Sequence, residues 1–434
     1  MPIVTMSLPV NVFMTALVAK AFPLPKVTIG LISALPFIGN FLQIFVAPFL
    51  AKWRPPKTVT AIAASLHLVS WAVFGLMLEW VPRHDPTAAG RWFIAWFLIS
   101  SCFAAVAGVS WNAWIQEWVP SRLRGRFFGQ RNRFLQVSTL VFMLLAGWIL
   151  AHWDYAIRAF QAIVALAVVM RVFSLRWQWQ SPTRALHRKP TPQLPVADQL
   201  RIVLARRSLL VFIAFGAVWS FAANCFGPFY HVFMFEQLDF TAFDVGLFLT
   251  LSQLGGALSL PAWGRLLDRY GNKSVMTFSL ILWQAQYLVW FFITPENRNW
   301  LYAMWFWAGM TSAGFVLGQF TILLRLIPVE AKNLAIGVNL AATSLVAASA
   351  PIIGGWILSR VLTGSPDDLA AYHWCFLLQP LLALLGCALL LRVHEPTASP
   401  LTMVFGAMRN IRTLSGVLGL DFLVNYVFYR PSKR

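Results

Sequence analysis

Long apolar stretches alternate with short polar and basic segments along the whole chain. Ten stretches contain no Asp, Glu, Lys or Arg, namely residues 27–51, 58–78, 92–116, 134–153, 208–235, 245–264, 274–295, 299–324, 333–359 and 369–391. An eleventh, residues 155–175, carries arginines only near its ends, at Arg158 and Arg171. A membrane-spanning helix needs about 20 mainly apolar residues. The pattern therefore predicts an all-α integral membrane protein with eleven full spans.

Residues 1–22 are a twelfth, shorter candidate span that is broken by Pro9 and Asn11. Their counterpart in the second half of the chain, residues 208–235, is longer, so we expect the first helix to be truncated. The reason is either a start codon assigned too far downstream or a real loss of the helix start, and we favour the start codon. A cleaved signal peptide fits less well, because no basic segment precedes the apolar stretch and no small-residue cleavage site follows it.

The second half of the chain repeats the first. The tetrapeptide Gly-Trp-Ile-Leu occurs at 147–150 and again at 355–358, a spacing of 208 that also aligns the residues upstream of it. A spacing of 216 covers the earlier part of each half, placing Gly39 on Gly255. Two long registers without gaps indicate a duplicated half. In the tetrapeptide we interpret the glycine as a site of close helix contact and the tryptophan as an interfacial anchor.

The duplication predicts how the chain is divided. We expect an N-terminal six-helix bundle at 1–179, a cytoplasmic linker at 180–207, a C-terminal six-helix bundle at 208–395 and a cytoplasmic amphiphilic tail at 396–434. Both bundles have the same orientation, so the repeat is parallel, as in secondary transporters built from two six-helix halves. The tail is expected to lie along the inner membrane surface.

Composition and charge sharpen this picture. The chain is 59% hydrophobic and 11% charged, against about 25% charged residues in a soluble domain. Of its 34 Lys and Arg residues, 27 lie in segments on one side of the predicted spans. Basic loops mark the cytoplasmic side, which predicts that both termini are cytoplasmic. Basic residues between apolar spans do not favour a nucleic-acid partner. The four cysteines stand singly, and we expect no metal site or disulfide.

The loop after the eighth predicted span carries a recognisable motif. It reads G-R-L-L-D-R-Y-G-N-K over residues 264–273 and resembles the signature G-x-L-x-D-R-x-G-x-K/R of the major facilitator superfamily. The matching positions are Gly264, Leu266, Asp268, Arg269, Gly271 and Lys273. The equivalent loop of the first half departs from it and keeps only Lys57. The segment 111–132 is similar to the loop between helices four and five of bacterial members.

The resemblance implies a twelve-helix fold in which two bundles rock around a midplane cavity by alternating access. It implies a monomeric, multi-pass transporter of the bacterial inner membrane that binds a small-molecule substrate within the lipid bilayer and needs no cofactor. It does not assign a substrate. We therefore expect secondary-active or facilitative transport of a small organic solute.

Few polar side chains lie near the predicted midplane. In the resembling family, helices 1, 2, 4, 5, 7, 8, 10 and 11 line the cavity. This implies a substrate cavity formed by Asn11, Asn40, Asn112, Asn224, Gln253 and Gln319, and it sets His67 on helix three aside. For each residue alone, an interhelical hydrogen bond that only adds packing is the competing interpretation.

The scarcity of charged residues within the predicted spans bears on the transport mechanism and on the substrate. All fifteen acidic residues stand at or beyond the ends of the apolar segments. Proton-driven carriers usually place a carboxylate within the membrane, so this weakly favours a uniporter. We also interpret the midplane as free of cations, which disfavours a strongly anionic substrate.

Two other classes of function compete with a carrier. A membrane enzyme is disfavoured, because the chain has no G-x-S-x-G, H-E-x-x-H or P-loop motif and no loop large enough for a catalytic domain. A lipid flippase or a membrane scaffold built on a transporter fold stays open, since the basic tail and the many tryptophans are compatible with it.

Two charged positions reverse sign between the halves. Asp268 on the signature loop aligns with Lys52, and Arg325 near the end of the tenth span aligns with Glu117. We predict that the loop and the helix are joined by an ion pair in each half, Asp268 with Arg325 and Lys52 with Glu117. Together with Gly264, Arg269, Gly271 and Lys273, these residues would form a conformational gate.

Overall fold

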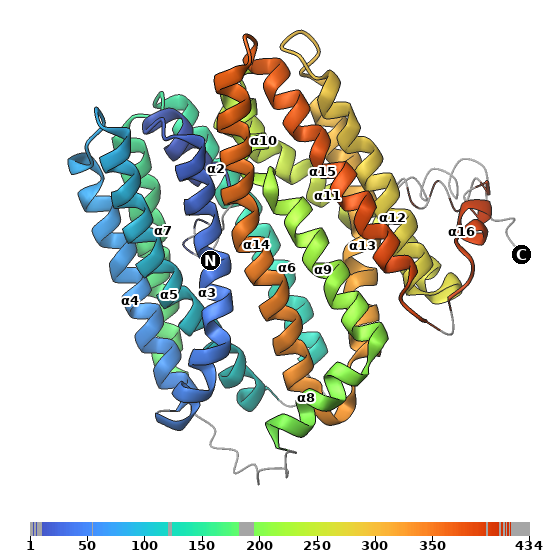
Figure 1. The fold of residues 1–434 in the computed structure, drawn as a ribbon. Coiled ribbons are helices and arrows are strands. Elements are labelled where there is room, and N and C mark those ends of the chain that lie inside the picture. Colours follow the sequence, from blue (N-terminus) through green and yellow to red (C-terminus); the bar gives the residue numbers. More distant parts are fainter. Residues whose placement is uncertain are drawn as a thin grey trace, which may run out of the picture. The chain divides into compact units, whose positions relative to one another are not determined.

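The computed structural model describes most of the chain as helix. Described are residues 3, 6, 11–53, 55–119, 124–181, 195–395, 398–407, 409, 410, 413, 415 and 417. Within this part every regular element is helical and no strand occurs (Figure 1). The prediction of an all-α protein is confirmed.

In its described part, the first half contributes four candidate spans and two shorter apolar helices. Its elements are α2 (Val12–Ala16), which continues as the π-helical turn η1 (Leu17–Ala21), then α3 (Lys26–Trp53), α4 (Pro56–Met77) with the 3-10 turn η2 (Leu78–Trp80), α5 (Pro86–Trp118), α6 (Arg124–His152) and α7 (Ile157–Gln180). Local sequence sets these boundaries. The Asp85 carboxylate accepts hydrogen bonds from the backbone N–H groups of Thr87 and Ala88, and Pro86 occupies the first position of α5.

The second half repeats this order after a short helix in the predicted linker. Its elements are α8 (Val196–Ala205), α9 (Arg207–Cys225), α10 (Gly227–Glu236), α11 (Ala242–Tyr270), α12 (Asn272–Tyr287) with η4 (Leu288–Phe292), α13 (Trp300–Leu326), η5 (Val329–Ala331), α14 (Lys332–Gly364), α15 (Asp368–Leu391) and, in the tail, α16 (Leu401–Ala407). Helices α9 and α10 together form one candidate span, Arg207–Glu236.

The helices are long and apolar enough to cross a membrane. Among the described residues, ten helices meet this condition, and two shorter apolar helices, Val12–Ala21 and Lys26–Leu42, occupy the places of spans one and two. This agrees with the predicted twelve-helix layout. Most residues before Val12 lie outside the described part, so the truncation of the first helix stays a prediction.

Two compact units of the chain cut across the sequence halves. Unit 1 comprises residues 1–193, 224–246 and 343–366, and unit 2 comprises residues 194–223, 247–342 and 367–434. One end of the span α9–α10 and one end of α14 therefore cluster with the first half. Each unit is described below by itself.

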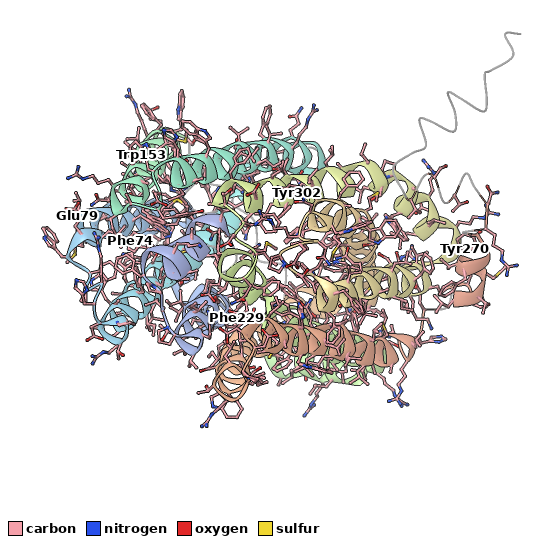
Figure 2. The ribbon with its side chains drawn as sticks, turned by 90° about the horizontal axis from the view of Figure 1, so that it is seen from above. Phe74, Glu79, Trp153, Phe229, Tyr270 and Tyr302 are labelled. Atoms are coloured by element: carbon pink, nitrogen blue, oxygen red, sulfur yellow. The ribbon has the colours of Figure 1, made fainter. Side chains whose placement is uncertain are left out.

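Aromatic rings hold the core of unit 1. Helices α4, α5 and α7 lie side by side (Figure 1). Between α4 and α5, the rings of Phe74 and Trp96 stack with their centroids 4.0 Å apart, and Trp71 meets Trp96 edge-on at 4.8 Å. The Trp96 indole N–H donates to the Ser70 carbonyl (2.8 Å), which satisfies its polar atom. Phe74 is fully buried between the helices, whereas Glu79 lies at the edge of the unit (Figure 2).

The core of unit 2 lies among α9, α12, α13 and α15. Phe215, Trp219 and Phe315 belong to one buried cluster, in which the Trp219 and Phe315 centroids are 4.6 Å apart. The tail packs against the same unit: Val404 of α16 is fully buried in a cluster with Trp263 of α11. The described part of the tail is thus docked on protein through one apolar side.

Candidate functional site

The two Gly-Trp-Ile-Leu segments form equivalent helix contacts in unit 1. A Cβ atom added to Gly147 of α6 would lie 2.6 Å from the Ala242 carbonyl oxygen at the start of α11. One added to Gly355 of α14 would lie 2.6 Å from the Lys26 carbonyl oxygen at the start of α3. Gly147 aligns with Gly355 at spacing 208, and Lys26 aligns with Ala242 at spacing 216. The same contact between the two halves is therefore made twice, and the predicted close approach of the glycines is confirmed.

A second pair of contacts follows the same symmetry. A Cβ on Gly30 would overlap the Pro351 carbonyl oxygen, and a Cβ on Gly246 would lie 3.3 Å from the Met143 carbonyl oxygen. Gly30 aligns with Gly246, and Met143 aligns with Pro351. Both pairs lie toward the helix ends that the charge pattern predicts to be extracellular. Small residues allow helices to approach this closely.

An ion pair joins the halves at the same end. The Lys26 ammonium donates to both Glu236 carboxylate oxygens, at 2.5 and 2.6 Å, and links the start of α3 to the end of α10. The two side chains are 15% and 31% exposed, so water screens the pair only in part. The two residues lie 210 positions apart, and no sequence pattern connects them.

The tryptophans of the two tetrapeptides face away from this contact. Trp148 is 53% exposed and Trp356 is 55% exposed. Trp148 stacks on His152 with ring centroids 5.3 Å apart, and the Arg360 guanidinium lies 5.7 Å from the Trp356 ring centroid. His152 aligns with Arg360 at spacing 208. Exposed rings beside polar groups are typical of anchors at a membrane interface.

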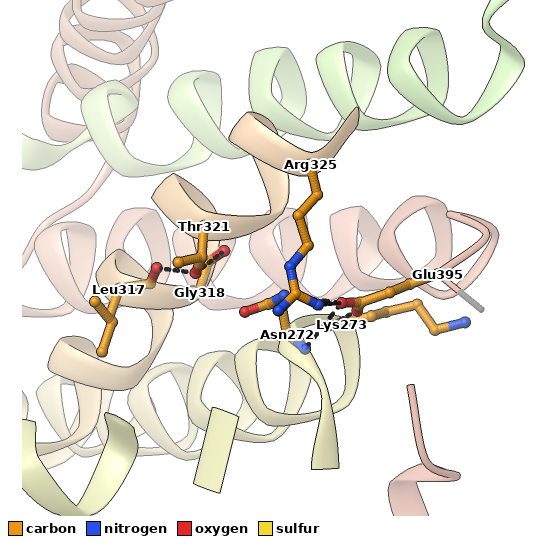
Figure 3. A network of polar contacts seen from close by, with 7 residues as sticks. All are labelled: Asn272, Lys273, Leu317, Gly318, Thr321, Arg325 and Glu395. Carbon is orange, nitrogen blue, oxygen red and sulfur yellow. Dashed lines mark hydrogen bonds and ion pairs between the residues drawn. The ribbon is translucent and has the colours of Figure 1, made fainter. Parts of the chain in front are cut away.

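A polar network occupies the opposite end of the second half, in unit 2. The Glu395 carboxylate accepts hydrogen bonds from the backbone N–H groups of Asn272 (3.3 Å) and Lys273 (2.7 Å) and from the Asn272 amide (2.8 Å). It also pairs with the Arg325 guanidinium at 3.0 Å. Figure 3 shows the carboxylate between α13 and the start of α12. A carboxylate at this position satisfies N–H groups that the helix leaves unpaired and favours the positive end of its dipole.

The predicted pairing of Arg325 with Asp268 is wrong. The structure places the Arg325 guanidinium on Glu395, while Asp268 is exposed, and no ion pair joins Asp268 to Arg325 among the described residues. The reason is that Glu395 serves two purposes at once, because it also caps α12. For the first half, the side chains of Lys52 and Glu117 lie outside the described side chains, so their pairing stays a prediction.

The signature loop is the turn between α11 and α12. Gly264 and Arg269 lie on the last turns of α11, and Lys273 lies in the first turn of α12. Gly271 joins the two helices with φ 86°, a backbone conformation that side chains with a Cβ rarely adopt. The motif glycine thus permits the sharp turn that brings the Lys273 N–H to Glu395.

Unit 1 contains a cavity of about 450 Å³ within the first half. It lies among α4, α5, α6 and α7. Its walls are formed by Thr60, His67, Ala104, Ala107, Gly108, Trp111, Asn112, Arg131, Leu135, Arg171, Ser174 and Gln178. Of the predicted substrate residues, Asn112 is the one that lines this cavity. His67, which sequence reasoning set aside, lines it as well and is 2% exposed.

Arg171 corrects the interpretation of a midplane without cations. The sequence pattern places it near the end of the apolar stretch 155–175, but it lies nine residues before the end of α7, within the span Ile157–Gln180, and is 8% exposed. Its Nε has no hydrogen-bond partner among the described residues. A sequence signal was present, because Ser174 and Gln178 follow at positions i+3 and i+7 and extend one polar face of the helix.

The other predicted substrate residues are distributed over both units. Asn11 is buried, and its side chain accepts from the Met14 N–H (2.9 Å) and donates to the Met6 carbonyl (3.1 Å), which caps α2. Asn40 and Asn224 are half-buried in unit 1, whereas Gln319 is half-buried and Gln253 exposed in unit 2. That all six face one cavity stays a prediction.

Comparison with known proteins agrees with this architecture. The family model of the Major Facilitator Superfamily matches residues 3–224 and 219–429. A bacterial homolog of the human lysosomal transporter Spinster is similar in structure, with a TM-score of 0.68 at 12% identity over 89% of this chain and 95% of its own. The D-xylose-proton symporter gives 0.68 at 13% identity over 91% and 96%. The xylose transporter XylE from E. coli gives 0.65 at 12% identity over 94% and 97%. No curated protein sequence matches significantly.

Two family matches, one on each half, cover nearly the whole chain. The chain therefore belongs to the Major Facilitator Superfamily. It is a multi-pass membrane transporter rather than an enzyme, and it moves a small-molecule substrate across the bilayer by alternating access.

Proposed function

We propose that this protein carries a small, neutral, polar organic solute across the plasma membrane. It works as a monomer, by facilitated diffusion or secondary active transport, with both termini in the cytoplasm. The uneven distribution of Lys and Arg supports this orientation. The substrate would bind between the halves, on Asn11, Asn40, Asn112, Asn224, Gln253 and Gln319.

The contacts between the halves in unit 1 carry this proposal. The Lys26–Glu236 ion pair and the glycine contacts at Lys26 and Ala242 close one end of the helices. A carrier that exposes one site to each side in turn needs a gate of this kind. We assign these contacts to the extracellular gate in its closed state.

Chemistry favours a solute with several hydroxyl groups. The six predicted residues are all amides, and each amide offers both a donor and an acceptor, as hydroxyl groups require. Among the similar structures are two xylose transporters and the nucleoside transporter NupG. At 12–14% identity these show the fold alone, and they supply the first compounds to test.

The test is uptake into proteoliposomes made with the purified full-length protein. Labelled D-xylose and uridine are the first two probes, and empty liposomes are the blank. The proposal expects saturable uptake of a neutral polar solute that is reduced at least about tenfold in Asn224→Ala, since a buried polar group of the solute then loses its partner. Transbilayer movement of a fluorescent phospholipid without solute uptake would instead support the flippase alternative and contradict the proposal.

A further inference from the structure

The cavity in the first half contains more positive charge than its described walls can balance. Arg171 and Arg131 line it, together with the polar side chains of Thr60, His67, Asn112, Ser174 and Gln178. None of the lining side chains that the structure describes is Asp or Glu. The Arg131 guanidinium rests on the Trp111 ring, 4.2 Å from the centroid, and donates to the Asn132 amide oxygen (3.1 Å). Arg171 has no such aromatic or amide partner among the described residues.

Arg171 is the group that most needs a partner. It is 8% exposed, its Nε forms no hydrogen bond, and it belongs to the polar face of α7 that Ser174 and Gln178 continue. A guanidinium buried in a membrane protein is costly unless an anion or backbone carbonyl groups accept its N–H groups. Nine residues separate it from the helix end, which corresponds to about 14 Å. Arg176, closer to that end, is exposed instead.

The neighbouring histidine is arranged as a neutral donor. The Trp71 indole N–H donates to His67 Nε2 at 3.2 Å, so this nitrogen carries a lone pair and the ring proton resides on Nδ1. His67 and Arg171 come from α4 and α7, helices that pack against each other. The cavity wall thus combines a fixed cation with neutral groups able to hydrogen-bond an oxyanion.

We propose that this cavity is a binding site for an oxyanion, a carboxylate or a phosphate group, with Arg171 as its counter-charge. All its described walls come from the first half, and Asn112 is the one residue that it shares with the substrate cavity proposed between the halves. The oxyanion belongs either to a small soluble anion or to the headgroup of an anionic lipid. In either case, the negatively charged oxygens of a planar carboxylate or a tetrahedral phosphate would accept hydrogen bonds from the guanidinium.

Two binding experiments on the full-length protein separate the sources. In neutral detergent, thermal stability is measured against inorganic phosphate and against benzoate, with benzamide as the uncharged isostere. In nanodiscs, stability and co-purifying lipid are compared between phosphatidylglycerol and phosphatidylcholine. Stabilisation by phosphate or benzoate identifies a soluble anion, and a preference for phosphatidylglycerol alone identifies a headgroup. Either result supports the site.

Three variants make the assignment to this cavity specific. Arg171→Gln removes the counter-charge and should weaken anion binding about tenfold or more, since losing one partner of a buried charge pair costs at least this much. Arg176→Gln removes an exposed arginine from the same helix and should leave binding unchanged. Gly108→Leu places an apolar side chain in the cavity and leaves the charge of Arg171 in place, since a Cβ on Gly108 meets no atom within 4 Å, and it should also abolish binding.

The outcomes decide the proposal even if Arg171→Gln fails to fold. In that case the test consists of anion binding in Gly108→Leu and of the stabilisation by benzoate compared with that by benzamide. Equal stabilisation by benzoate and benzamide, no preference for any anion in either system, or unchanged anion binding in Gly108→Leu would overturn it. An equal loss of anion binding in Arg171→Gln and Arg176→Gln would also overturn it, because it would show that anions are attracted non-specifically to positive charge.

Discussion

Gly355 lies against the backbone of Lys26 so closely that a single added carbon would come within 2.6 Å of the Lys26 carbonyl oxygen. The duplicated half makes the same contact between Gly147 and Ala242, also at 2.6 Å. A contact that recurs at equivalent positions is a property of the repeat, and in a two-bundle carrier it lies where the halves must separate and meet again.

Replacing these glycines with alanine tests whether the contact closes the gate. Gly355→Ala and Gly147→Ala should each force the helices apart at a cost of about 1–3 kcal/mol, the usual penalty of overpacking. Uptake into proteoliposomes should fall in both. Gly337→Ala is the matched control on α14, because its Cβ meets no atom within 4 Å. Uptake by both gate variants equal to that of the control would contradict this role.

Breaking the ion pair should favour opening of the same gate. Lys26→Ala or Glu236→Ala removes an interaction worth about 1 kcal/mol, which changes the ratio of closed to open states about fivefold. Alkylation of a cysteine placed behind the gate, in a background without reactive native cysteines, measures this ratio. The exchange Lys26→Glu with Glu236→Lys should restore the original rate.

The control for that experiment is another ion pair in the chain. Arg201 and Asp198 of α8 are 3.8 Å apart, and their side chains are 85% and 49% exposed. Asp198→Asn should leave alkylation unchanged, because so exposed a pair contributes little. If the double exchange at the gate fails to restore the rate, attraction between Lys26 and Glu236 is not what holds it closed.

Glu395 is expected to stabilise the second half. Glu395→Ala removes the cap of α12 and the partner of Arg325 together, and should lower the free energy of unfolding by about 1–3 kcal/mol. Thermal unfolding of the purified protein measures the change. Glu330→Ala removes an exposed carboxylate and serves as the control. Equal melting temperatures for the two variants would show that the network adds no net stability.

The charge reversal in the first half predicts a rescue. Lys52→Glu and Glu117→Lys should each impair transport, and the double variant should recover it if the two side chains attract each other. Uptake by the three variants at equal protein density measures this. The second half offers no such rescue for Asp268, since Arg325 pairs with Glu395. If transport does not recover in the double variant, attraction between Lys52 and Glu117 does not explain the reversal of charge between the halves.

Structural features that occur in both halves could be predicted from the sequence, whereas features that occur in one half could not. The glycine contacts could be anticipated, because Gly147 and Gly355 stand in identical tetrapeptides on apolar helices. Glu395 could not, since its partners Arg325 and Asn272 lie 70 and 123 positions away and no local periodicity connects them. Arg171 was placed near the end of an apolar stretch, because the number of charges in a segment does not give their depth in the membrane. The polar face that Arg171 forms with Ser174 and Gln178 was nevertheless present in the sequence.

We infer that the glycine contacts and the ion pair together form the gate of an alternating-access carrier. Spin labels at Glu79 and Gly364, both exposed in unit 1, report its opening as a distance distribution in lipid, with Cys102 replaced by serine. We expect a short and a long distance in the unmodified gate, with a larger population of the long distance in Gly355→Ala and no such increase in Gly337→Ala. A single distance that is the same in all three proteins would contradict it.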